Sequence, residues 1–202
     1  MSHHVYTTPG FVIDSRPNGE AGKLLYIFTR DVGLVLAAAQ GIRLGVSKLR
    51  YHTQDFSHAL FSLVRGKEIW RLTGATSLDA FLPTNATLDP VYFLRARIFA
   101  VLRRLLHGEE ANEKLFDAIM SFEKWISSAG FLHDDIESVE CIMVLRILHI
   151  LGYAEHGSKG SSQLSIFLGD PSDWSAQLII EMQAARTAAV KAINSGLKAS
   201  QL

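Results

Sequence analysis

The chain has 202 residues, enough for one large hydrophobic core or two small ones. Its composition, 48% hydrophobic and 20% charged, is typical of a soluble globular protein, and it lacks the run of about 18 apolar residues that a transmembrane helix needs. The formal net charge is zero, and a single cysteine, Cys141, excludes an internal disulfide and a four-cysteine zinc site.

The first ten residues, "MSHHVYTTPG", have neither the charged region nor the apolar region of a secretory signal peptide. We therefore expect no secretion. The single cysteine also favours a reducing compartment. Together these features predict a cytoplasmic protein that does not enter a membrane.

The first part of the chain is divided into short apolar runs by turn signals such as Pro17 and the pair Asn18-Gly19. We predict strands over residues 10–15, 23–30, 34–40, 51–64 and 69–75. Five strands in roughly 75 residues is the scale of a small closed barrel such as the oligonucleotide-binding (OB) fold.

From residue 83 the apolar residues repeat at helical spacing. After a linker over residues 83–90, Asp89 is the expected helix cap and Pro90 the first helical residue. Further helices are expected after Asn112, over residues 136–151 up to Gly152, and over residues 174–193, with a loop at 156–162. The expected fold class is α+β: a five-stranded OB barrel over residues 1–82, followed by an all-α helical bundle over residues 83–202.

Catalytic signals are weak. The pair His133-Asp134 resembles the His-Asp pair of some metal-dependent phosphohydrolases, but Asp134 with Glu137 also forms a capping box before an apolar helix, and we favour the cap. His149 is expected to be a hydrogen-bonded core residue. Cys141 lies among apolar helical neighbours and is expected to pack as a small apolar side chain. We predict no catalytic residue, no metal site and no cofactor.

Charge is distributed unevenly along the chain. Residues 1–82 contain nine Lys and Arg residues against six acidic ones, and residues 83–202 contain eleven against fourteen. A local positive field attracts a polyanion even when the total charge is zero.

The predicted nucleic-acid contacts are basic residues of the barrel, above all those of the loop "GIRLGVSKLR" at 41–50. The candidates are Arg43, Lys48 and Arg50 in that loop, Arg65 and Lys67 in the hairpin turn, and Arg16, Lys23 and Arg71 beside them. Trp70 either stacks on a base or packs in the core. The alternative is that these cations form an ordinary solvated surface.

Several stretches of the sequence resemble those of a known protein family. The stretches "GFVIDSRPNGEAGKLLYIFTRDVG", "LAAAQGIRLGVSKLR" and "QDFSHALFSLVRGKEIWRLTGA" resemble, in order, the amino-terminal domain of RecO, the bacterial recombination mediator. In the helical half, "LRRLLHGEEANEKLFDAIMSFEKWI" and "RILHILGY" resemble RecO segments as well. The resemblance covers most of residues 5–153.

The resemblance implies an OB fold followed by a helical domain, in a non-enzymatic DNA repair and recombination protein. Such a protein binds single- and double-stranded DNA, promotes strand annealing and helps load a recombinase. It implies a RecR-like partner and single-stranded DNA-binding protein as partners, and a place on the bacterial nucleoid. Arg43, Lys48 and Arg50 match the family's basic loop, and Arg65-Gly66 its hairpin turn.

The chain departs from the family pattern at three places. Leu44 stands where the loop often has another basic residue, which predicts modest DNA affinity. "AEHGSKGSSQLSIFLG" replaces the four-cysteine zinc module of many members, which suggests a short form without that module. Residues 141–144 differ from the family's usual sequence, so the site for the tail of single-stranded DNA-binding protein stays unassigned. The alternative function is a protein-interaction scaffold with the same fold and little DNA affinity, and a third is a metal-dependent hydrolase using His133 and Asp134.

Overall fold

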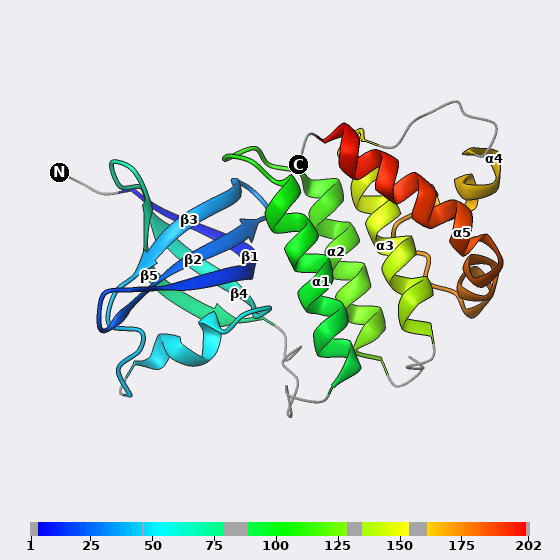
Figure 1. Ribbon diagram of the computed structural model, residues 1–202. Helices are drawn as coiled ribbons and strands as arrows, with labels where there is room; N and C mark the ends of the chain where they lie inside the picture. Colours follow the sequence, from blue (N-terminus) through cyan, green and yellow to red (C-terminus); the bar gives the residue numbers. More distant parts are fainter. Residues whose placement is uncertain (1–3, 46, 79–88, 129–134, 154–160, 201–202) are drawn as a thin grey trace. The chain divides into compact units, whose positions relative to one another are not determined.

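The computed structural model describes residues 4–45, 47–78, 89–128, 135–153 and 161–200 (Figure 1). The chain divides into two compact units. The first, which we call the barrel unit, is Met1–Thr84 with Leu106–Glu113. The second, the helical unit, is Asn85–Leu105 with Lys114–Leu202. The barrel unit therefore takes a short segment from between two helices.

The barrel unit contains a closed five-stranded barrel in the order β1-β2-β3-β5-β4. Its strands are β1 (Val5–Asn18), β2 (Gly22–Thr29), β3 (Gly33–Ala39), β4 (His58–Val64) and β5 (Trp70–Ser77). All neighbouring pairs are antiparallel except β3 and β5, which run parallel through only two residue pairs, Ala37 with Trp70 and Ala38 with Arg71. The five-stranded OB-type barrel expected from the sequence is confirmed.

The barrel closes around alternating apolar side chains. Along β3, Val35, Ala37 and Ala39 are buried while the residues between them are only partly covered. A strand that places every second residue inward buries one face against the barrel interior. β1 is longer than expected and pairs with β4 along its first half and with β2 along its second, with a register shift between Val12 and Asp14. A bulge at that point bends β1, so that it can pair with both β4 and β2.

The predicted fourth strand was wrong over residues 51–57. There the chain forms a 3-10 helix, η1 (Lys48–Thr53), followed by a turn, and β4 begins only at His58. Phe56 has a φ of 70°, which no strand residue adopts. The side chain of Thr53 donates to the carbonyl oxygen of Leu49 at 2.8 Å, a contact within one helical turn.

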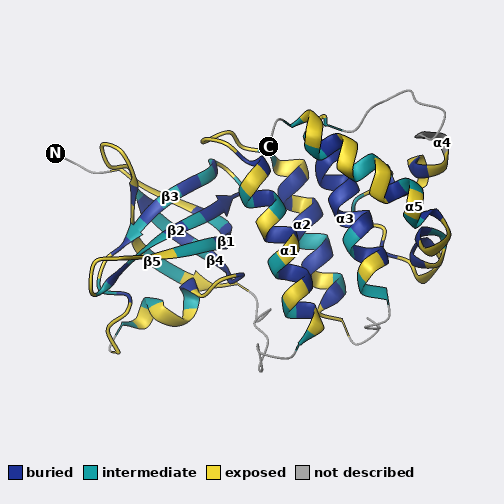
Figure 2. Cartoon of the chain, in the orientation of Figure 1, coloured by how far each residue is buried: buried dark blue, intermediate teal, exposed yellow. Residues whose placement is uncertain are grey.

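The helical unit is built around α3, which is buried along most of its length (Figure 2). Its elements are α1 (Pro90–Leu105), α2 (Glu113–Ile126), α3 (Ile136–Ile150), α4 (Ser161–Leu164), η3 (Ser165–Leu168) and α5 (Ala176–Ala199). α3 packs against α1 and α5. None of the helices in the described part of the chain has the length and hydropathy needed to cross a lipid bilayer.

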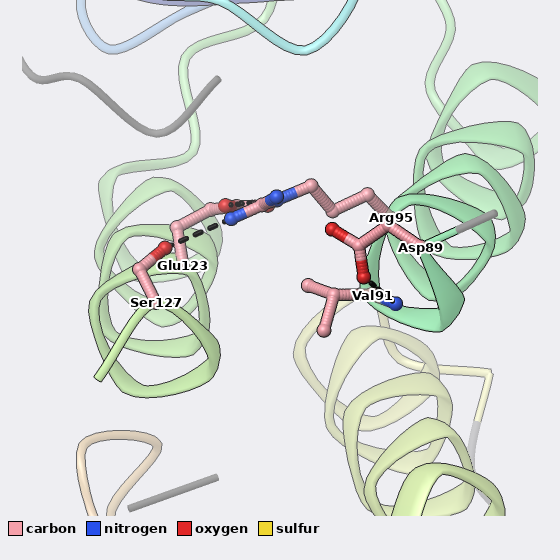
Figure 3. Close-up of polar contacts among 5 residues, drawn as sticks. All are labelled: Asp89, Val91, Arg95, Glu123 and Ser127. Carbon is pink, nitrogen blue, oxygen red and sulfur yellow. Dashed lines mark hydrogen bonds and ion pairs between the residues drawn. The ribbon is translucent and has the colours of Figure 1, made fainter. Parts of the chain in front are cut away.

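Most of the expected helix ends are confirmed, but the last helix, α5, begins at Ala176, so Trp174, which was expected within it, precedes the helix. Asp89 accepts a 2.9 Å hydrogen bond from the backbone N–H of Val91 at the start of α1 (Figure 3). Gly152, with a φ of 79°, ends α3. Glu137 forms an ion pair with Arg186 of α5, and its expected capping partner, Asp134, lies outside the described residues.

A buried arginine, Arg146, fixes the chain before α5. Arg146 of α3 is 2% exposed, and its guanidinium donates to the carbonyl oxygens of Phe167, Pro171 and Asp173 at 3.0, 3.1 and 2.8 Å. It also lies 4.5 Å from the ring centroid of Trp174. Burial lowers the pKa of Arg146 to about 10, so the side chain still carries its charge near neutral pH.

Candidate nucleic-acid interface

The loop after β3 leads into η1, which is fixed against the barrel on one side and open to solvent on another. Leu49 packs against the barrel core, and Thr53 is 2% exposed. The hydroxyl of Ser57 donates to the carbonyl oxygen of His52 at 3.0 Å, which holds the end of η1. Tyr51, in contrast, is 71% exposed. Because residues three apart share a face in a 3-10 helix, η1 has one face toward the core and another toward solvent.

A pocket of about 450 Å³ lies beside η1. It is lined by Lys23, Ile42, Arg43, Arg50, Thr53 and Gln54. Three of these residues are predicted DNA contacts, and none of the lining residues is acidic. Cationic side chains on the low-dielectric walls of a pocket produce a concentrated positive potential inside it. The pocket therefore suits an anionic group such as a phosphate.

The backbone positions Arg43 at the pocket. Its N–H donates to the carbonyl oxygen of Ala21 at 3.0 Å, and its guanidinium donates to that of Gly19 at 3.4 Å. These bonds connect the β3–η1 loop to the turn between β1 and β2. Residues that are far apart in the sequence therefore contribute to one lining.

Lys23 is held at the same place by a short chain of side chains. Its ammonium group donates to the hydroxyl of Ser15 at 3.3 Å, and Ser15 donates to Asp55 at 2.6 Å. Asp55 is thus separated from Lys23 by one hydroxyl group. An ammonium group has three donors, so Lys23 retains donors for a ligand.

Arg16 lies on β1 and has its own carboxylate partner. Its Nε is 3.7 Å from Asp14, and its guanidinium is 5.4 Å from the ring centroid of Tyr26. The ion pair is largely exposed, so water and salt screen it. Arg16 does not line the pocket.

Arg65 is also paired with a carboxylate. Its guanidinium lies 3.0 Å from Glu109, in the segment that follows α1, and 5.5 Å from the ring centroid of Trp70. Trp70 is 3% exposed and donates from Nε1 to Glu109 at 2.8 Å. The core-packing interpretation of Trp70 is confirmed, because its ring is covered and its N–H is satisfied.

Lys48, Lys67 and Arg71 are exposed and have no carboxylate partner among the residues that the structure describes. Arg71 lies in one row with Ala38 of β3 and Leu24 of β2. With strands about 4.8 Å apart, its backbone is roughly 10 Å from β2. It points outward, because Trp70 and Leu72 on either side are buried. The structure thus gathers Lys23, Arg43 and Arg50 around the pocket, and the other five candidates lie outside its lining.

The predicted contacts did not include Tyr51, Thr53 or Gln54. All three lie in the stretch that was expected to be a strand, and an aromatic residue in a strand does not by itself indicate a binding role. A signal was present in "KLRYHT", since an aromatic residue between cations is common in single-strand binding surfaces.

The helical unit carries a second pocket of about 550 Å³, bordered by Arg146, His149 and Asp170 among others. His149 is only half-buried at this pocket, near the end of α3. Cys141 is buried, and burial is the main cause that raises the pKa of its thiol, as expected for a packing residue. In the described ranges no three His, Cys, Asp or Glu residues are grouped to hold a metal ion. His133 lies outside these ranges.

The barrel and the helical unit define a protein with an OB-type domain and a helical domain. Residues 1–81 match the family described as "Recombination protein O N terminal". The chain is 32% identical over 149 residues to DNA repair protein RecO of Heliobacterium modesticaldum, a match covering 74% of this chain and 52% of the relative. It is 31% identical over 153 residues to the RecO of Rubrobacter xylanophilus, covering 74% and 58%.

A third relative, the RecO of Desulfitobacterium hafniense, is 28% identical over 173 residues, covering 82% of this chain and 61% of the relative. Residues 1–81 thus form a domain of the RecO amino-terminal family, and the chain is similar to RecO proteins over most of its length. It spans about half the length of the curated relatives it matches.

Proposed function

We propose that the chain binds single- and double-stranded DNA through the basic residues of its barrel, promotes strand annealing and assists recombinase loading. The observation that carries the proposal is the pocket at which Lys23, Arg43 and Arg50 meet without an acidic residue in the lining. The similarity to RecO proteins supports it, because the relatives are named DNA repair proteins.

The proposed contacts differ in how available they are. Lys23, Arg43 and Arg50 surround the pocket, and Lys48, Lys67 and Arg71 are exposed cations outside it. Arg16 and Arg65 would exchange a carboxylate for a phosphate, which contributes less. We therefore assign DNA contact to residues 1–82 and propose that residues 83–202 serve contacts with a RecR-like partner and with single-stranded DNA-binding protein.

Annealing by such a surface requires no bond chemistry, and we propose no enzymatic activity. Two strands repel each other through their phosphates, and cations placed along one strand lower that repulsion. Backbone contacts of this kind carry little sequence information, so binding should be nearly independent of base sequence. In a bacterial cell they would keep the protein on the nucleoid.

The test is a salt titration of binding to a fluorescent single-stranded oligonucleotide. The variant with Arg43, Lys48 and Arg50 all replaced by Ala should bind less tightly, and its log–log salt slope should be smaller by about 2, at about 0.7 per lost phosphate contact. The matched control replaces three exposed lysines of the helical unit, Lys124, Lys191 and Lys198, and should leave the slope unchanged. Equal slopes for the barrel variant and the wild type would contradict the proposal.

A protein-interaction scaffold is the second candidate. The carboxylate partners of Arg16 and Arg65 favour it, as does the zero net charge. On that reading the wild-type chain fails to bind DNA even at low salt while it still associates with partner proteins. The same titration, combined with a pull-down using purified partners, separates the two functions.

A further inference from the structure

We propose that Tyr51 stacks on an unpaired base while the pocket beside it holds a phosphate of the same strand, so that η1 distinguishes single-stranded DNA from duplex. The inference rests on the proposed DNA binding and adds a strand preference to it. The ligand class is a single-stranded polynucleotide with at least one unstacked base.

The position of the Tyr51 ring is the first observation. At 71% it has the largest exposed fraction among the large hydrophobic side chains that the structure describes as exposed. No hydrogen bond or ring contact joins it to another described residue. The ring therefore contributes little to the barrel core and is accessible to a flat ligand.

The cations around Tyr51 are the second observation. Lys48 precedes it by three residues and shares its face of η1, because a 3-10 helix repeats every three residues. Arg50 and Thr53 share the neighbouring face and line the pocket. A base stacked on Tyr51 would thus lie near Lys48, on the same face of η1, and next to the face of η1 that carries Arg50 and borders the pocket. Stacking on aromatic rings next to a positive groove is how proteins bind single strands without reading their sequence.

The strand preference follows from what each group can reach. Phosphates are exposed in both single-stranded and duplex DNA, so the pocket attracts both. In a duplex each base is covered on both faces by its neighbours, and Tyr51 can stack only after unpairing. Tyr51 should therefore add affinity for single strands alone, without changing the number of ions released.

The experiment measures binding by fluorescence anisotropy at several salt concentrations, for a single strand and a blunt duplex of the same length. The proteins are the full chain and its variants Tyr51→Ala, Tyr51→Phe and Arg50→Gln. Tyr51→Ala should weaken single-strand binding by about 5- to 150-fold, the range measured for loss of one stacked base. Duplex binding should change less than about 2-fold, and both salt slopes should stay the same.

The other two variants keep the result interpretable. Tyr51→Phe retains the ring and should bind like the wild type. Arg50→Gln should weaken both DNA forms and reduce the single-strand slope by about 0.7. If Tyr51→Ala leaves single-strand binding unchanged, or weakens both forms equally, the stacking inference is wrong while DNA binding stands. If the wild-type chain binds neither form at low salt, the proposed function itself fails.

Discussion

Arg95 of α1 and Glu123 of α2 form an ion pair inside the helical unit, with 2.8 Å between Nε and Oε2 and side-chain exposures of only 4% and 0% (Figure 3). Arg95 also donates to the hydroxyl of Ser127 at 2.8 Å. Two charges removed from water each need the other, because an unpaired buried charge is strongly destabilising.

Replacing Arg95 with Met should therefore lower the free energy of unfolding by about 3 kcal/mol, measured by urea denaturation at pH 8. The control on the same helix is Arg97→Met, which breaks a 2.7 Å pair with Glu140 whose side chains are 46% and 29% exposed. That variant should change the free energy by less than about 1 kcal/mol, because water screens an exposed pair. Similar losses in the two variants would show that burial is not the deciding factor.

The same pair makes stability depend on pH. Burial raises the pKa of Glu123 from 4.5 to about 7, against the lowering effect of Arg95. Between these values the folded chain holds a proton that the unfolded chain releases, so this contribution to stability falls as pH rises from 4.5 to 7. The total fall is of order 3 kcal/mol.

Glu123→Gln removes the titration and keeps the shape. The difference in unfolding free energy between wild type and Glu123→Gln, measured at several pH values, should therefore change across this window and level off above pH 7. A difference that is constant with pH would argue against the raised pKa.

Gly33 sits where the segment after α1 approaches the barrel unit's own β3. It has a φ of 86°, and a Cβ there would lie 2.3 Å from the carbonyl oxygen of Glu110. Gly33→Ala should destabilise the barrel by more than about 2 kcal/mol, because both the backbone conformation and the contact oppose it. Gly19, with a φ of 66° and nothing within 4 Å of its Cβ position, is the control; Gly19→Ala should cost only about 1 kcal/mol. Thermal denaturation of both variants tests whether the close approach adds to the conformational cost.

Glu109 pairs with Arg65 and would compete with a phosphate for its guanidinium. Glu109→Gln retains an acceptor for Trp70 but removes the carboxylate that pairs with Arg65. If the proposed DNA binding is correct, this variant should bind single strands more tightly and increase the salt slope by about 0.7, since one more cation becomes available. The gain should vanish in the double variant Glu109→Gln with Arg65→Gln. Weaker binding in the single variant would instead mean that Glu109 supports the barrel more than it restrains Arg65.

Local signals in the sequence were enough for most of the elements. The strand β3 and the cap at Asp89 each depend on residues close together in the chain, and both were predicted. The prediction of the fourth strand was wrong over residues 51–57 for a local reason too. The positive φ at Phe56 and the hydrogen bond from Thr53 to Leu49 cannot be recognised in a pattern of apolar residues.

The candidate site was only partly predictable because it is assembled from distant residues. Lys23 lies on β2 and Arg50 in η1, and the packing of η1 on the barrel places both at one pocket. The pairing of Arg65 with Glu109 crosses from the barrel strands to a segment beyond α1, and no composition or spacing rule indicates it. Counting positive charges could therefore identify candidates without telling which of them are paired.

The parallel contact between β3 and β5 has a practical consequence. Only two residue pairs join these strands, and Trp70, at one of them, is hydrogen-bonded to Glu109. The β3–β5 contact that closes the barrel is thus supported by Glu109, a residue that follows the first helix in the sequence. A fragment that ends at residue 82 would lack Glu109. An isolated barrel should therefore be made by joining the segment Leu106–Glu113 to the barrel strands, and not by a single truncation.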